Sequence, residues 1–244
     1  FYGKLGATAK NRMNYPNGVD FDPVSNRLFV ADGLNARVLI FDVASITDGE
    51  NATNELGQAT FTAATLATTV NGLNYVYHAQ FDAPNNRLFI TDYGNNRVMV
   101  YDLASITDGE NAVNVLGQAD FTTGSTGLTQ SRFSTPQDLA YDSASSRLFV
   151  ADLNNRRVMV FDVASITDGE NAVNVLGQTN FTASGATVSQ NGLLNPRGLA
   201  LDSGNNRLYN VDYLHCRVLS FDVASITDGE NADNVIGQTD GMGG

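Results

Sequence analysis

The sequence of 244 residues is poor in cysteine and histidine, and each scarcity excludes a class of site. Cys216 is the single cysteine, so no disulfide can form within the chain. With His78 and His215 as the only histidines, no Cys/His spacing typical of zinc occurs, and no metal site is predicted from these residues. Apolar runs are no longer than a strand, which argues against membrane insertion.

Positive charge is also scarce. The chain has 14 Lys and Arg against 26 Asp and Glu, a formal net charge of −12. Such a surface repels phosphate backbones, so nucleic acid is not an expected partner. The sequence shows no signal peptide and begins with Phe1 rather than Met, which favours a processed chain at an extracellular or cell-surface location.

Glycine is abundant, with 23 residues, and charged residues make up only 16% of the chain, which favours short strands and tight turns. The main signal is an internal repeat. Residues 41–52 return almost unchanged from Tyr101, Phe161 and Phe221, without insertion or deletion, so the period is 60 residues. The copies lie at 11–70, 71–130, 131–190 and 191–244 of a single repeat domain.

Each copy contains four segments that are typical of strands. They are predicted at positions such as 196–202 after a Pro-x-Gly turn, 87–92, 97–102 and 114–118, with a Thr/Gly/Ser-rich loop leading to the next copy. Four antiparallel strands per repeat form a blade whose faces only neighbouring blades can bury. The predicted fold class is therefore all-β, a β-propeller of four four-stranded blades.

The repeat resembles a known family. Residues 196–218, with Pro-x-Gly-Leu-Ala-x-Asp, Arg-Leu-Tyr-x-x-Asp and Arg-Val, resemble an NHL repeat, and residues 116–122 resemble a linker of bacterial extracellular NHL-like proteins. The resemblance covers essentially the whole chain and implies a propeller whose first strands line a central channel. NHL propellers mostly have more than four blades, so two arrangements stay open: a closed ring of four, or an open section of a larger propeller or array.

The first ten residues are predicted to be an extra strand. Residues 2–6 resemble the fourth strand of a preceding copy, although the last copy already has its own fourth strand at 234–238. Such a strand can close the ring or pair with a neighbouring molecule. Self-association is therefore an expected property.

Charges that recur in every copy are interpreted as structural. An Asp and an Arg occur once per copy at constant spacing, as in Asp92 and Arg97, and we expect them to pair because partly buried charges need partners. The recurring Thr-Asp-Gly-Glu-Asn segment, with Asp48 and Glu50 in the first copy, offers oxygen ligands for calcium. It lacks the ligand spacing of an EF-hand loop, so an ordinary turn is the favoured interpretation and no cofactor is predicted.

A unique binding site should break the symmetry of the repeats. His78 stands where two other copies have glycine and the third has Asp138, near the start of the first strand. With Tyr75, Tyr77 and Gln80 close in sequence, His78 and Asp138 are candidates for binding a small polar ligand at the mouth of a channel. A surface histidine without function is the alternative, and the favoured one.

Two further features break the repeat. His215 and Cys216 are adjacent in the last copy, but no third group can be named to orient a catalytic pair, so no catalytic residue is predicted. Asn51 and Asn180 begin Asn-x-Thr sequons and are candidate glycosylation sites.

The sequence therefore predicts a non-catalytic extracellular scaffold that associates with itself or with another protein or glycan, for example as a filament or surface structure. An enzyme with a channel metal, of the propeller lactonase or lyase kind, is the first alternative, but two histidines cannot supply three convergent ones. A peptide- or glycan-binding module is the second alternative.

Overall fold

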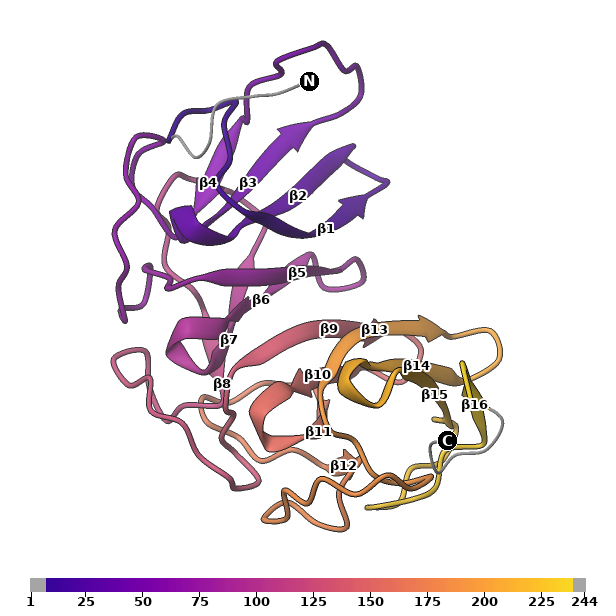
Figure 1. The fold of residues 1–244 in the computed structure, drawn as a ribbon. Helices are drawn as coiled ribbons and strands as arrows, with labels where there is room; N and C mark the ends of the chain where they lie inside the picture. Colours follow the sequence, from indigo (N-terminus) through magenta and orange to yellow (C-terminus); the bar gives the residue numbers. More distant parts are fainter. Residues whose placement is uncertain (1–7, 239–244) are drawn as a thin grey trace. The chain divides into compact units, whose positions relative to one another are not determined.

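The computed structural model describes residues 8–238, and these form an all-β chain of sixteen strands (Figure 1). The strands form four antiparallel sheets, each in simple meander order. We call the sheets blades 1 to 4. Blade 1 contains β1 Pro16–Asp22, β2 Arg27–Asp32, β3 Arg37–Asp42 and β4 Asn54–Leu56; blade 2 contains β5 Val76–Asp82, β6 Arg87–Asp92, β7 Arg97–Asp102 and β8 Asn114–Leu116. Blade 3 contains β9 Pro136–Asp142, β10 Arg147–Asp152, β11 Arg157–Asp162 and β12 Asn174–Leu176; blade 4 contains β13 Pro196–Asp202, β14 Arg207–Asp212, β15 Arg217–Asp222 and β16 Asn234–Ile236.

The chain divides into two compact units, one over residues 1–125 and the other over residues 126–244, each with two blades. In every blade a short 3₁₀ helix joins the second and third strands, and these helices are η1 Gly33–Asn35, η2 Tyr93–Asn95, η3 Leu153–Asn155 and η4 Tyr213–His215. The residue after each helix adopts a left-handed conformation, for example Asn96 at φ 54°. Residues 1–7 of the predicted extra strand at 1–10 lie outside the described residues, and the strand stays a prediction.

Each blade has two faces because side chains alternate along a strand. In the N-terminal unit, Phe29, Val38 and Ile40 of blade 1 lie in one buried cluster with Leu88 and Met99 of blade 2. In the C-terminal unit, Phe149 and Val160 of blade 3 are similarly buried with Leu208 and Phe221 of blade 4. We call the side of a blade that packs on the next copy its following face, and the other side its preceding face.

Candidate functional site

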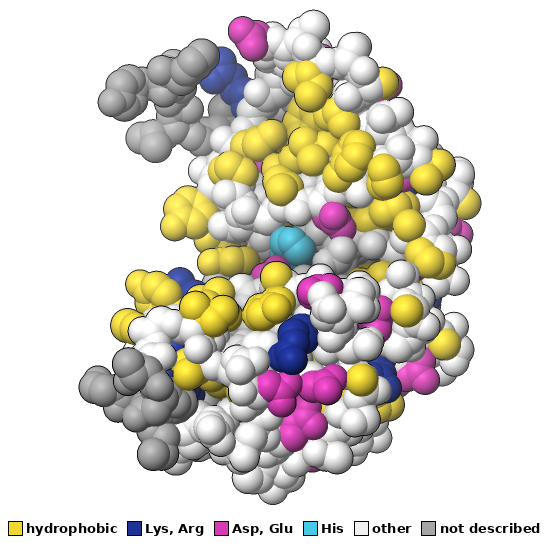
Figure 2. Space-filling model, turned by 90° about the vertical axis from the view of Figure 1, so that its right-hand side faces the viewer, with side chains coloured by type: hydrophobic (Ala, Val, Ile, Leu, Met, Phe, Trp, Pro, Cys, Tyr) yellow, Lys and Arg dark blue, Asp and Glu magenta, His cyan; other side chains and the backbone are white. Residues whose placement is uncertain are grey.

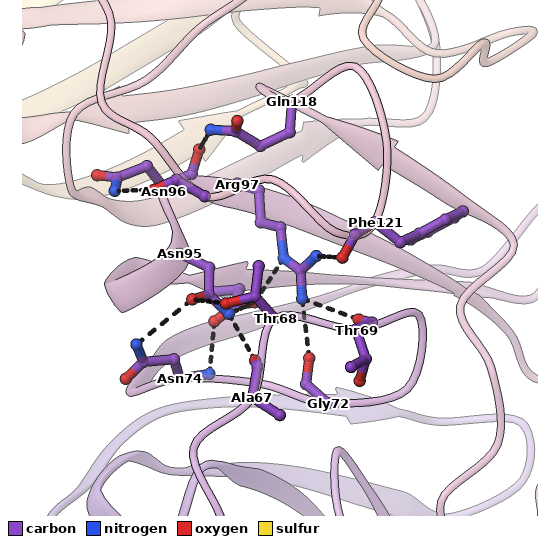
Figure 3. A network of polar contacts seen from close by, with 12 residues as sticks. Ala67, Thr68, Thr69, Gly72, Asn74, Asn95, Asn96, Arg97, Gln118 and Phe121 are labelled. Carbon is purple, nitrogen blue, oxygen red and sulfur yellow. Dashed lines mark hydrogen bonds and ion pairs between the residues drawn. The ribbon is translucent and has the colours of Figure 1, made fainter.

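A buried arginine ties each blade to the loops around it (Figure 3). Arg97 is fully buried, and its Nε donates to Asp92 Oδ2 at 2.7 Å. Its remaining nitrogens donate to the carbonyl oxygens of Phe121, Thr69 and Gly72 at 2.5, 3.0 and 2.8 Å. One guanidinium therefore joins two strands of blade 2, the loop that enters the blade and the loop that leaves it.

The same arrangement recurs in the other copies, which supports the structural interpretation of these charges. Arg37, Arg157 and Arg217 each donate through Nε to the Asp five residues earlier, at 2.8, 2.8 and 3.1 Å. His215 has a structural role at this position. Its Nδ1 lies 2.7 Å from Asp212 Oδ2, and in blade 2 the Nδ2 of Asn95 makes the equivalent contact with Asp92 Oδ2. Cys216 is exposed, so these two residues form a capping contact and an exposed thiol rather than a dyad.

Lowering the pH from 7 to 5 will strengthen the contribution of the Asp–Arg pairs in blades 2 and 3 to stability. Burial raises the pKa of Asp92 and of Asp152 to about 6, above the ordinary value near 3.9. Their contribution is fully present below the unfolded pKa and is lost as the pH rises through about 6. Urea unfolding at the two pH values measures it, and the variant Asp92→Asn should show a smaller gain than the wild type. A free energy of unfolding that falls between pH 7 and pH 5 would contradict this prediction.

The Thr-Asp-Gly-Glu-Asn segments form turns, and those of blades 2 and 4 contact the preceding blade of the same unit. Glu110 Oε2 accepts the backbone N–H of Thr107 at 2.9 Å within its own turn. Asp108 Oδ1 accepts the backbone N–H of Glu55 in blade 1 at 3.1 Å, and Asp228 does the same for Val175. In the described part of the chain, no group of three or more His, Cys, Asp or Glu is placed to hold a metal ion. The ordinary turn stays the favoured interpretation of these segments, and calcium binding stays the untested alternative.

The candidate ligand residues of β5, His78 and Gln80, contact two different residues of blade 1. His78 is half-buried and packs on Gly18 of blade 1 so closely that a Cβ on Gly18 would lie 2.1 Å from its ring. Gln80 Nε2 donates to Asp20 Oδ2 at 2.7 Å, and that oxygen also accepts the N–H of Phe81. These contacts link the first strands of blades 1 and 2.

Asp138 lies in the C-terminal unit, whereas Tyr75, His78 and Gln80 lie in the N-terminal one. Its Oδ2 accepts the backbone N–H of Leu199 at 2.7 Å, which links the first strands of blades 3 and 4. The binding role of all four residues stays a prediction. Asn51 and Asn180 are both exposed, so the sequons are accessible, and their glycosylation also stays a prediction.

The structure does gather tyrosines around Tyr75. The ring centroids of Tyr15, Tyr77 and Tyr93 lie 6.3, 6.3 and 5.5 Å from that of Tyr75. Sequence reasoning missed Tyr15 and Tyr93, since they come from another blade and from η2. The signal in the sequence is that each tyrosine stands at a repeat position where two other copies have a residue that is not aromatic.

A second feature of the N-terminal unit is the preceding face of blade 1, where some apolar side chains are exposed although Val30, Leu39 and Phe41 on the same side are buried in a cluster with Phe61. Val19, Phe21 and Ile46 are 58%, 43% and 72% exposed. Hydrophobic side chains gather over this unit in the upper part of Figure 2. In blade 2 the equivalent Ala79 and Phe81 are 0% and 9% exposed, because blade 1 covers them.

Glu55 distinguishes the same face of blade 1, and sequence reasoning did not single it out. It is fully buried where the other copies have valine, and its Oε2 accepts from Arg37 Nη1 at 2.9 Å. Burial raises the pKa of this carboxyl. Blade 1 thus differs from its copies on the side that blade 2 of the same unit does not cover.

Comparisons with known proteins identify the fold. No protein-family profile matches the chain, and no curated protein matches it. A solved structure that it resembles is a chain of the crystal structure of a nidogen/laminin complex, with a TM-score of 0.61 and 16% identity over 97% of this chain and 68% of that one. Within residues 8–238, no helix is long and apolar enough to cross a membrane. At this identity the likeness concerns the fold alone, and with four meander sheets it identifies the chain as an all-β protein of the β-propeller fold.

Proposed function

We propose that the chain is a non-catalytic, extracellular scaffold of NHL-type blades that assembles head to tail with further copies of itself. The preceding face of blade 1 is the docking surface, and the following face of blade 4 in a second copy is its occupant. The similar solved structure is that of a nidogen/laminin complex, a pairing of two proteins, and this supports a protein partner.

The exposure of Val19, Phe21 and Ile46 carries the proposal. Within each unit the preceding face of the second blade is covered by the blade before it, as in the packing of Phe29 on Phe81 with ring centroids 5.7 Å apart. Burying one large apolar side chain contributes about 1.5–3 kcal/mol. Three exposed apolar side chains on one face are therefore a strong reason for association.

The following face of blade 4 has apolar residues at the repeat positions that would meet the preceding face of blade 1. Tyr209 stands where blade 1 has Phe29, so by repeat equivalence it would pack on Phe21 as Phe29 packs on Phe81. Val211 and Ile236 of blade 4 are 39% and 56% exposed. These two faces, which we call the docking faces, thus offer apolar side chains at the positions that join blades within a unit.

Sedimentation velocity over a wide range of concentrations tests the proposal. We expect the sedimentation coefficient to rise with concentration, because head-to-tail contacts do not close at two copies unless the rotation between them allows it. A single species with the mass of one chain at every concentration would contradict assembly through these faces.

A further inference from the structure

Four tyrosines of the N-terminal unit form a cluster of rings in mutual contact, which we call the tyrosine platform: Tyr15, Tyr75, Tyr77 and Tyr93. Besides the contacts of Tyr75, the rings of Tyr77 and Tyr93 lie 5.8 Å apart at 31°. Tyr15 is 61% exposed, and the other three are half-buried. The platform therefore presents ring surface to solvent while ring-to-ring contacts restrict its side chains.

The backbone holds the platform in place. The carbonyl oxygens of Tyr15 and Tyr75 accept N–H groups from Gly33 and Tyr93 at 3.2 and 3.1 Å. Both tyrosines adopt left-handed conformations, with φ of 62° and 57°, which are unusual for bulky residues. Asn17 Nδ2 bridges the two blades by donating to the carbonyl of Val76 at 3.0 Å. The platform is thus positioned before any ligand arrives.

The fold does not require these rings. The other copies build the same turns with different residues at the equivalent positions. Thr135 and Asn195 stand at the position of Tyr15 and Tyr75. The position of Tyr77 has Asn17, Gln137 and Arg197, and that of Tyr93 has Gly33, Leu153 and Tyr213. Tyr213 is the one aromatic equivalent, and Arg197 covers it, with the guanidinium carbon 4.2 Å from the ring centroid. In the described part of the chain no cation lies over the four rings of the platform.

We propose that the tyrosine platform binds a neutral oligosaccharide, whose pyranose rings stack their apolar C–H faces on the tyrosine rings. The phenol hydroxyls supply donors and acceptors for sugar hydroxyls. This site is separate from the preceding face of blade 1, and it adds a carbohydrate ligand to the scaffold.

The ring geometry favours a sugar over other ligands of aromatic sites. Ring centroids at 5.5–6.3 Å with tilts of 31–54° place the rings in contact, so no slot separates them. A proline-rich peptide docks in grooves between aromatic walls, and a quaternary ammonium group needs rings around a gap. Nucleobases also stack on tyrosine, but the net charge of −12 repels their phosphates. A pyranose lies flat and needs neither a slot nor a charge.

Isothermal titration calorimetry with cellohexaose, mannohexaose, chitohexaose and decaproline tests the proposal. At least one hexasaccharide should bind, and Tyr77→Ala and Tyr93→Ala should each weaken its binding by about tenfold or more, as loss of a stacking ring does elsewhere. Tyr77→Phe, which keeps the ring, should retain most of the affinity. Tyr213→Ala is the matched control at the position equivalent to Tyr93, and it should leave the affinity unchanged.

Three results would overturn the proposal. The first is that no hexasaccharide binds to the wild-type chain. The second is that decaproline binds with the same dependence on Tyr77 and Tyr93. The third is that Tyr213→Ala weakens sugar binding as much as Tyr93→Ala does. Thermal unfolding of each variant, followed beside the titrations, shows that a loss of binding comes from the folded protein.

Discussion

Replacing Arg97 with alanine will lower the free energy of unfolding by about 3–5 kcal/mol, the usual cost of removing one partner of a buried ion pair. The change leaves the carboxylate of Asp92 buried without its cation. It also leaves the carbonyls of Phe121, Thr69 and Gly72 without the donors that Arg97 supplies. Because these carbonyls belong to loops on both sides of the blade, the loss should unfold the blade rather than a local turn.

Two further variants sharpen the test of Arg97, with urea unfolding as the measurement. Arg97→Lys keeps the charge but not the planar fork, so it should recover only part of the loss. Arg207→Ala is the control, because that side chain is 37% exposed and lies 3.4 Å from Asp233 at the surface. Its effect should stay within about 0.5 kcal/mol. A loss below about 1 kcal/mol for Arg97→Ala would contradict the structural role of the repeated pair.

Replacing Phe21 with aspartate will weaken self-association by about 100-fold or more. The change removes an aromatic ring from the preceding face of blade 1 and places a carboxylate where an apolar face of the second copy would have to cover it. Within one chain the cost is small, since Phe21 is already 43% exposed. The expected result is therefore a folded chain with the mass of a monomer at concentrations where the wild type associates.

Leu34→Asp is the matched control for Phe21→Asp. Leu34 belongs to the same blade and is 46% exposed, but its position on the 3₁₀ helix is exposed in all four copies. No blade covers it anywhere in the two units, so its replacement should leave association intact. Equal sedimentation of the Phe21→Asp variant and the wild type would show that association uses another surface.

The repeat made most of the fold predictable. The strands at Arg87–Asp92 and Arg97–Asp102 begin and end where the sequence places them, because the Asp and Arg at their ends pair across the turn in every copy. The fourth strand is shorter than predicted, ending at Leu116, since Gly117 takes a positive φ of 86°. Identical local sequence thus fixes identical local structure.

The candidate site was less predictable, because it depends on which blades touch. Gln80 was chosen as a ligand residue for its place near His78, yet its side chain contacts Asp20 of the neighbouring blade. Tyr15 and Tyr75 are 60 residues apart, and only packing of blade 1 on blade 2 brings their rings to 6.3 Å. Residues that depart from the repeat do mark the candidate site. They are informative when two of them face one another across neighbouring blades.

A disulfide between the two docking faces tests the central claim of head-to-tail assembly most directly. Gly18 and His78 mark the closest approach of blades 1 and 2, since a Cβ on Gly18 would lie 3.0 Å from the Cα of His78. By repeat equivalence, Gly198 of one copy should approach Gly18 of the next in the same way. Cysteines at these two positions would then lie within reach of a disulfide, at the short end of the Cα separations that disulfides span.

The measurement uses the variant Gly18→Cys with Gly198→Cys, in a chain that also carries Cys216→Ser and His78→Gly, the latter because a Cβ on Gly18 would lie 2.1 Å from the ring of His78. Oxidation followed by non-reducing electrophoresis should give a ladder of covalently linked copies, which reducing agent collapses to one band. Each single-cysteine variant is the control and should give dimers at most. An intact monomer band, whether from a disulfide within one chain or from no disulfide at all, would contradict assembly of separate copies through these two faces.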